Sequence, residues 1–214
     1  MLLEICANSY QSAKNAQEAG ALRIELYQEL SVGGVTPSYG LIKQVKDQLS
    51  IETFVLIRPR SGNFNYSDVE FDIMKHDIQL IKEIGCHGIV SGVLHIDNSI
   101  DIERTKELVE IAKPMNFTFH RAFDWVLNPI DEIKNLEAIG IVRILTSGQE
   151  TSAEKGLNNL IEFQKATSKI TIMPGGGINK NNIKLFQENG LKEVHLSATS
   201  QTKTIEKPAI SMNS

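Results

Sequence analysis

Short apolar segments alternate with longer segments of helical periodicity from one end of the chain to the other. The short segments are rich in β-branched and aromatic residues, and the longer ones repeat apolar residues three and four positions apart. We predict strands at residues 2–6, 22–26, 53–57, 88–92, 116–120, 142–146, 170–173 and 193–197. We predict helices between them at residues 9–19, 37–49, 67–84, 101–112, 129–139, 152–166 and 180–189.

This order of elements predicts a (β/α)8 TIM barrel, because strands that alternate with helices form parallel sheets. A doubly wound open sheet is the alternative that the same pattern allows. The residues after 197 are polar and include Pro208, so a short or missing eighth helix is expected.

We expect one barrel domain over residues 1–200 and a polar C-terminal tail over residues 201–214. Without an eighth helix, the outer face near the last and first strands needs another cover. The tail or a second subunit would supply it, and the second choice favours a homodimer.

Several predicted strands alternate apolar and polar residues, although strands covered on both faces usually read as continuous apolar runs. In the second strand, Arg23 and Glu25 alternate with leucine and isoleucine, and Glu4, His120 and His195 occupy similar positions in other strands. Because strand side chains point alternately to opposite faces, these groups are expected inside the barrel. The pattern therefore predicts a polar pocket at the C-terminal ends of the strands, with a structural ion-pair network as the alternative.

Candidate catalytic groups are the inward carboxylates and imidazoles, which can act as general acids or bases: Glu4, Glu25, His120 and His195. Glu25 lies beside the strand that carries Arg58, so we expect Glu4, Glu25 and Arg58 to form a carboxylate–guanidinium cluster. No pair of histidines has the HExxH spacing of a zinc site.

Donors for an anionic ligand follow several predicted strands. Arg58 and Arg60 end the third strand, and Arg121 follows the fifth, where an ion pair with Asp124 is the structural alternative. The glycine run after the seventh strand precedes a helix that we expect to begin near residue 179, an arrangement that binds phosphate; a tight loop is its alternative. The other ligand-binding candidates are Thr146, Ser147, Gly175, Gly176, Gly177 and Ser197.

Composition narrows the class of partner. The chain has 22 Lys+Arg against 26 Asp+Glu and a net charge of −4, which argues against a nucleic-acid partner. No apolar stretch has the length of a membrane span, and the first residues lack the basic start of a signal peptide, so we expect no membrane partner. Two cysteines are too few for a disulfide scaffold, which favours a cytoplasmic location.

The motifs EIC, RIEL, GGVTPS, IRPR, TFHRAFD, ILTSGQ and EVHLSA, with the glycine run, resemble the CutC family over nearly the whole chain. The resemblance implies a cytosolic barrel protein of copper homeostasis, with Cu(I) as its candidate ligand. In some relatives one cysteine in each of the first two strands is a proposed Cu(I) ligand. Here the first is Cys6 and the second position holds Tyr27, whose phenol does not replace a thiolate. Cys86 is expected at the opposite end of the barrel.

Three functions fit these observations. The first is a copper-binding protein of copper homeostasis, with Cys6 as a metal ligand. The second is an enzyme that acts on a small anionic metabolite, such as a phosphorylated one, at the C-terminal rim of the barrel. The third is a protein that binds such an anion without transforming it, and the pattern of residues does not separate it from the second.

Overall fold

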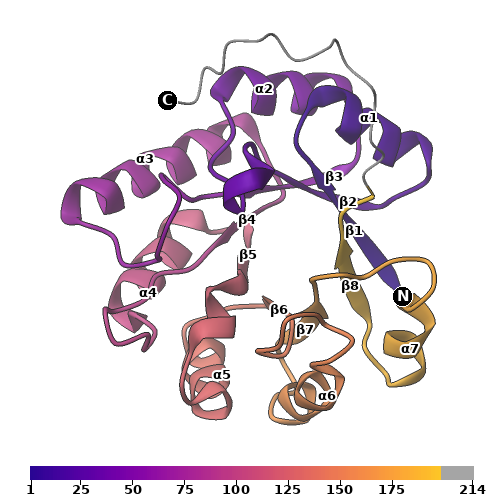
Figure 1. Ribbon diagram of the computed structural model, residues 1–214. Coiled ribbons are helices and arrows are strands. Elements are labelled where there is room, and N and C mark those ends of the chain that lie inside the picture. The colour runs from indigo at the N-terminus through magenta and orange to yellow at the C-terminus, as the bar shows by residue number, and fades with distance from the viewer. Residues whose placement is uncertain (199–214) are drawn as a thin grey trace, which may run out of the picture.

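Eight parallel strands follow one another around a nearly closed barrel in the computed structural model of the chain, which describes residues 1–198 (Figure 1). Neighbouring strands are hydrogen-bonded in the order β7-β6-β5-β4-β3-β2-β1-β8. A parallel bridge between Gly175 and His195 joins the two ends of this order. The strands are β1 (Leu2–Ala7), β2 (Arg23–Leu26), β3 (Glu52–Leu56), β4 (Gly88–Ser91), β5 (Asn116–Phe119), β6 (Arg143–Thr146), β7 (Thr171–Pro174) and β8 (Glu193–Leu196). The predicted (β/α)8 barrel is confirmed, and the open-sheet alternative is wrong.

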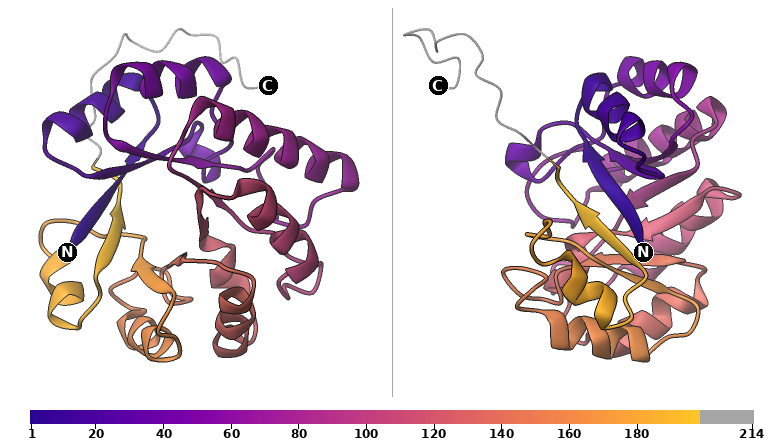
Figure 2. Two further views of the ribbon diagram at one scale, coloured as in Figure 1. Left: turned by 180° about the vertical axis from the view of Figure 1, so that it is seen from behind. Right: turned by 90° about the vertical axis from the view of Figure 1, so that its right-hand side faces the viewer.

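Helices ring the outside of the barrel, one after each of the first seven strands (Figures 1 and 2). They are α1 (Tyr10–Glu18), α2 (Tyr39–Gln48), α3 (Asp68–Ile84), α4 (Ile102–Ala112), α5 (Pro129–Ala138), α6 (Leu157–Lys165) and α7 (Ile183–Glu188). Local chemistry explains several ends: Ser9 and Ser67 form capping boxes, and Pro129 occupies the first turn of α5. None of the helices among residues 1–198 is long and apolar enough to cross a membrane.

The strand ends at the C-terminal rim depart from the predicted pattern. Two 3-10 turns, η1 (Leu30–Val32) and η2 (Arg121–Trp125), follow β2 and β5 and were not predicted. Helices α6 and α7 begin several residues later than expected, because the residues after β6 and β7 form loops. These loops build the rim on which the candidate site lies.

The outward faces of most strands are completely buried against helices, as Ile24, Val55 and Ile144 show. The first strand is the exception: Leu3 and Ile5 are only partly buried, and a groove of about 520 Å³ runs between β1 and α1. The predicted tail and any eighth helix lie outside the described residues. The cover for this face, by the tail or by a second subunit, therefore stays a prediction.

The inner face of the barrel holds a second, smaller apolar cluster in which Phe54 is the largest fully buried side chain. Arg23 and Arg143 lie over its ring, with their guanidinium carbons 5.1 and 5.2 Å from the ring centroid. Gly88 is the register partner of Phe54 on the next strand, and a Cβ there would lie 2.3 Å from the ring. A glycine at this position gives the aromatic ring its space inside the barrel.

Substituting Gly88→Ala is expected to lower the free energy of unfolding by about 1–3 kcal/mol. The added methyl group would displace the Phe54 ring and disturb the two arginines stacked on it. Gly40→Ala is the matched control, since Gly40 is an exposed residue of α2 and no atom lies within 4 Å of the added methyl group. The control is expected to leave stability unchanged or raise it by up to about 1 kcal/mol. Urea unfolding of both variants tests this, and equal stabilities would contradict it.

Candidate functional site

A chain of buried charges fills the barrel below its C-terminal mouth. The Glu4 side chain is inaccessible to solvent and accepts a hydrogen bond from Arg23 Nε at 2.5 Å. Arg23 also pairs with Glu193, which accepts from Arg143 Nε at 2.6 Å. Arg143 donates in turn to the Thr118 hydroxyl at 3.0 Å. The ion-pair network offered as an alternative interpretation is therefore present, and it forms the floor beneath a pocket.

The expected cluster of Glu4, Glu25 and Arg58 is wrong, because other arginines supply the positive charge. Glu4 and Arg23 are register partners on β1 and β2, so their side chains enter the barrel at one height. Arg58 lies beyond the end of β3 and is out of reach of Glu4. Alternation correctly placed Arg23 inside the barrel, but its pairing with Glu4 and the parts played by Arg143 and Glu193 were not predicted.

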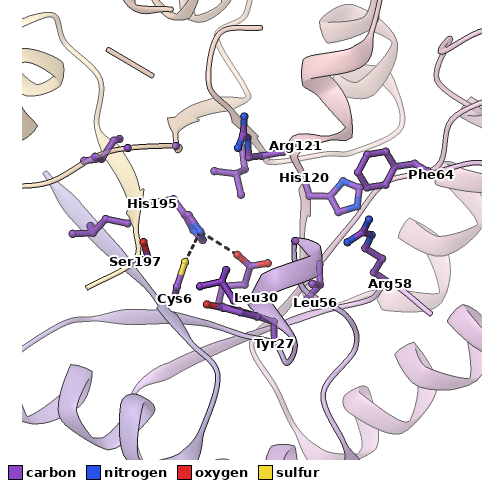
Figure 3. A pocket seen from close by; sticks show the side chains of 17 residues that line it. Cys6, Tyr27, Leu30, Leu56, Arg58, Phe64, His120, Arg121, His195 and Ser197 are labelled. Atoms are coloured by element: carbon purple, nitrogen blue, oxygen red, sulfur yellow. Dashed lines mark hydrogen bonds and ion pairs between the residues drawn. The ribbon is translucent and has the colours of Figure 1, made fainter. Parts of the chain in front are cut away.

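His195 connects this network to the pocket, and Figure 3 shows its ring beside Cys6 at the pocket wall. Its Nδ1 lies 2.9 Å from Glu4 Oε1, and its Nε2 lies 2.9 Å from Cys6 Sγ and 3.3 Å from Glu25 Oε2. Strand register explains the meeting, because Glu4 pairs with His195 across β1 and β8, and Cys6 pairs with Glu25 across β1 and β2. One thiol, one carboxylate and one imidazole nitrogen thus converge, with all three atoms within 4.8 Å of one another.

The ionisation of these groups follows from burial and from their neighbours. Burial alone would lower the pKa of His195, but Cys6, Glu4 and Glu25 outweigh it and raise that pKa well above its usual value. Burial would raise the pKa of Glu4, yet His195 and Arg23 hold it below the usual range. For Glu25 burial dominates and raises the pKa to about 7. The imidazolium therefore sits between one fixed carboxylate and one that changes charge near neutral pH.

A cavity of about 260 Å³ opens above these groups at the C-terminal mouth. Figure 3 shows Cys6 and His195 on one side of it and His120, Arg58 and Phe64 on the other. Every strand except β4 contributes to its wall directly or through the residues that follow the strand. The predicted site residues that line it are Cys6, Glu25, Arg58, His120, Arg121, Gly176, Gly177, His195 and Ser197.

Arg58 is a buried cation with no carboxylate partner among the described residues. Its Nη1 donates to the carbonyl oxygens of Val32 and Gly34 at 2.9 and 2.8 Å, and its Nη2 donates to that of Gly62 at 2.7 Å. The guanidinium lies over the Phe64 ring, 5.1 Å from the centroid, and Nε has no partner in the described part of the chain. The carbonyl dipoles stabilise the charge without cancelling it.

His120 stands beside Arg58 as a neutral imidazole. It is 5% exposed, and burial together with the Arg58 charge lowers its pKa to about 3. Its Nδ1 accepts a hydrogen bond from the Ala122 N–H at 3.3 Å, so the proton of the neutral ring is on Nε2. Within residues 1–198 this Nε2 has no hydrogen-bond partner, and the ring packs against Phe64 with centroids 4.7 Å apart.

Arg121 and Asp124 form the ion pair offered as the structural alternative, with Nε 2.8 Å from Oδ2. Asp124 also accepts from the Ser147 N–H at 3.0 Å and from the Thr146 hydroxyl, so its oxygens are fully used in holding the rim. Arg121 Nη2 donates to Ser147 Oγ at 2.9 Å. Asp124, Thr146 and Ser147 thus lie behind the cavity wall, and Arg121 is the member of this group that faces the cavity.

The glycine run forms a loop and not the start of a helix. Gly175 N–H donates to the Thr146 carbonyl, whereas Gly176 and Gly177 adopt left-handed backbone conformations at φ 105° and 78° and line the cavity. Helix α7 begins at Ile183, so the expectation of a helix from residue 179 is wrong; Asn182 bonds the Asn179 N–H and makes a turn there. The run is thus a tight loop at the cavity wall, and its binding of an anion stays a prediction.

Arg60 is separated from the other candidates. Its guanidinium pairs with Glu70 of α3 at 2.5 Å and lies over Tyr66, away from the cavity wall. Arg58 and Arg60 were both expected at the end of the third strand, two positions apart and thus on one face. The strand ends at Leu56, so the alternation of faces does not extend to either residue. Phe64, which contacts both Arg58 and His120, was missed because it lies in an irregular loop with no sequence pattern.

Comparisons with known proteins agree on one family. The CutC family model matches residues 1–200. Proteins named family protein CutC from Salmonella agona and Salmonella typhimurium are each 44% identical over 197 residues, which is 92% of this chain and 79% of theirs.

Solved structures show the same relationship. The crystal structure of the putative copper homeostasis protein CutC from Streptococcus agalactiae has a TM-score of 0.86 and 35% identity, over 91% of this chain and 97% of that one. A 3-hexulose-6-phosphate synthase from Salmonella typhimurium has a TM-score of 0.65 at 16% identity, over 92% and 89% of the two chains. The second likeness shows the barrel fold alone.

Substituting Glu25→Gln is expected to change how stability depends on pH. Because the folded-state pKa of Glu25 is raised to about 7, its contribution is fully present below about pH 4.5 and is lost as the pH rises through 7. The loss amounts to at most about 3 kcal/mol in the wild type and is absent in the glutamine variant. Urea unfolding of both proteins at about pH 5 and about pH 8 measures the difference. Parallel pH profiles would contradict the buried, titrating carboxyl group.

Proposed function

The chain belongs to the CutC family, and on this premise we propose that it binds copper, as Cu(I), at the mouth of the barrel. The proposed ligands are Cys6, His195 and Glu25. One observation carries the proposal: a thiol, an imidazole nitrogen and a carboxylate oxygen from three different strands lie within 4.8 Å of one another at the wall of an open cavity. The name of the Streptococcus relative, a putative copper homeostasis protein, points the same way.

The donor set fits copper better than a hard cation. A thiolate is the preferred ligand of Cu(I), and imidazole also suits copper, whereas magnesium and calcium favour oxygen ligands. Cys6 and His195 are therefore the principal ligands in this proposal, and Glu25 is an auxiliary one. Because His195 is protonated in the absence of metal and a ligand must be neutral, copper binding would release a proton from the site.

Glu4 gives His195 the orientation that a metal ligand needs. The Glu4 carboxylate accepts from Nδ1, which leaves Nε2 directed at Cys6 and the cavity. A carboxylate behind a metal-ligating imidazole fixes the tautomer and makes the ring a better donor. Glu4, a candidate catalytic residue from its sequence position, is on this account a positioning residue.

The other two candidates for copper ligation are unsuited. Burial raises the pKa of Tyr27, so its phenol stays protonated beside Cys6. Cys86 is buried at the start of β4, at the opposite end of the barrel, and burial raises the pKa of its thiol to about 11. The site that we propose therefore contains one protein thiolate.

An enzyme that acts on an anionic metabolite stays a prediction. The 3-hexulose-6-phosphate synthase shares the fold at 16% identity, and this likeness says nothing about the chemistry in this cavity.

The homodimer and the cytoplasmic location expected from the sequence are likewise proposals. The partly uncovered face of β1 favours the homodimer.

Substituting Cys6→Ser is expected to weaken Cu(I) binding by at least ~100-fold, because a hydroxyl does not replace the soft thiolate. Competition against a Cu(I) chelator under anaerobic, reducing conditions measures the affinity. Cys86→Ala is the matched control, which removes the second thiol and is expected to keep wild-type affinity. Equal Cu(I) affinities of the wild type and Cys6→Ser would contradict the proposed site.

Substituting Glu4→Gln tests the positioning role separately. The change keeps the shape of the side chain but removes the charge that orients His195, and a loss of ~10–100-fold in Cu(I) affinity is expected. Because Glu4 also pairs with Arg23, thermal unfolding of the metal-free variant must accompany the measurement. A folded Glu4→Gln protein with undiminished affinity would show that His195 needs no orienting carboxylate.

A further inference from the structure

The cavity is much larger than a single metal ion requires. Its volume of about 260 Å³ approaches the lower end of the range for small-molecule sites, about 300 Å³. Cys6 and His195 occupy one side, and the remaining wall extends across the mouth to Arg58 and His120 (Figure 3). A second molecule would therefore share this space with the ion.

The protein supplies only one sulfur ligand for Cu(I) among the residues described. Cys6 supplies one thiolate, and no other sulfur-bearing residue lines the cavity among residues 1–198. Cu(I) in proteins favours sulfur ligands. A sulfur atom that enters through the open mouth of the cavity would meet this preference.

The opposite wall favours a negatively charged group. Arg58 is buried and has no counter-ion among residues 1–198, and the adjacent His120, which also lines the cavity, has a buried Nε2 N–H without a partner there. Arg121 uses Nε and Nη2 on Asp124 and Ser147, and its Nη1 remains beside Gly176. A buried cation without a partner raises the affinity of its surroundings for an anion.

The backbone adds donors beside Arg121, in the glycine loop that follows β7. Gly176 and Gly177 line the cavity in left-handed conformations, and no acceptor for their N–H groups is found in the described part of the chain. Successive N–H groups in such a turn form a concave surface that binds carboxylate or phosphate oxygens. The wall away from Cys6 thus holds two guanidinium groups, and the glycine loop adds backbone donors between Arg121 and His195.

Resting on the copper site proposed above, we infer that the cavity holds Cu(I) together with a small thiol that carries a carboxylate. The sulfur of this thiol would complete the coordination that Cys6 and His195 begin. Its carboxylate would lie against Arg121 and the adjacent glycine loop, near the uncompensated charge of Arg58. The thiol loses its proton to solvent when its sulfur binds the metal, and copper stays Cu(I) throughout.

Native mass spectrometry of the wild-type protein, loaded anaerobically with one equivalent of Cu(I), tests the inference. Three probes are added at equal concentration: mercaptosuccinate, which has both groups; 2-mercaptoethanol, which lacks the carboxylates; and succinate, which lacks the thiol. We expect a complex that contains one protein, one copper ion and one mercaptosuccinate. Its fraction of the total protein should be at least ~10-fold higher than that of the complex with either control compound.

Two variants locate the carboxylate. Arg121→Gln is expected to lower the affinity for mercaptosuccinate by at least ~10-fold, because one charge-assisted contact is lost. Arg104→Gln, which removes an arginine of α4 outside the cavity, is the matched control and is expected to behave as the wild type. Arg58 is unsuitable for this test because its side chain also holds the loops at Val32 and Gly62.

The outcomes separate this inference from the copper site itself. Equal occupancy by 2-mercaptoethanol and mercaptosuccinate would overturn it, because the cationic wall would then play no part. Loss of copper to mercaptosuccinate without a ternary complex would also overturn it, because the thiol would then be a competitor. Absence of copper in every arm, including the arm without thiol, would overturn the proposed copper site and the inference with it.

Discussion

The interior of this barrel is organised by the need to neutralise Glu4, a carboxylate with no access to solvent. An unpaired charge at such a depth costs several kcal/mol, so its two oxygens must find cationic partners. Arg23 occupies one oxygen and His195 the other, and both partners lie on the strands adjacent to β1. The position of Glu4 thereby fixes the imidazole ring, and the ring places Nε2 against the only thiol of the cavity wall among the described residues.

This constraint divides the mouth of the barrel into two chemically different sides. On the side of β1 and β8, a thiol, an imidazole and a titrating carboxyl group are in contact, which suits a soft metal ion. On the side of β3 and β5, the Arg58 guanidinium and the His120 N–H have no anionic partner among residues 1–198. A molecule that uses both sides must be soft at one end and negative at the other, which restricts the ligand more than either side alone.

The sequence allowed the barrel and most of its inner residues to be predicted, because both depend on simple periodicities. Alternation in β2 and β8 correctly assigned Glu25 and His195 to the interior, and the strand order then brought them to one rim. Pairing was harder to predict, because it depends on register: a shift of one residue would have changed the partner of Glu4. Arg60 shows the other limit, since parity along the chain loses its meaning once the strand has ended.

Arg58 has a structural role that reaches beyond its charge. Its guanidinium is bonded to carbonyl oxygens in two separate loops, one after β2 and one after β3, and so works as a tether between them. A residue without these donors would leave both loops without the side chain that joins them, whatever ligand the protein takes. One guanidinium group therefore both links the two loops of the rim and supplies its uncompensated positive charge.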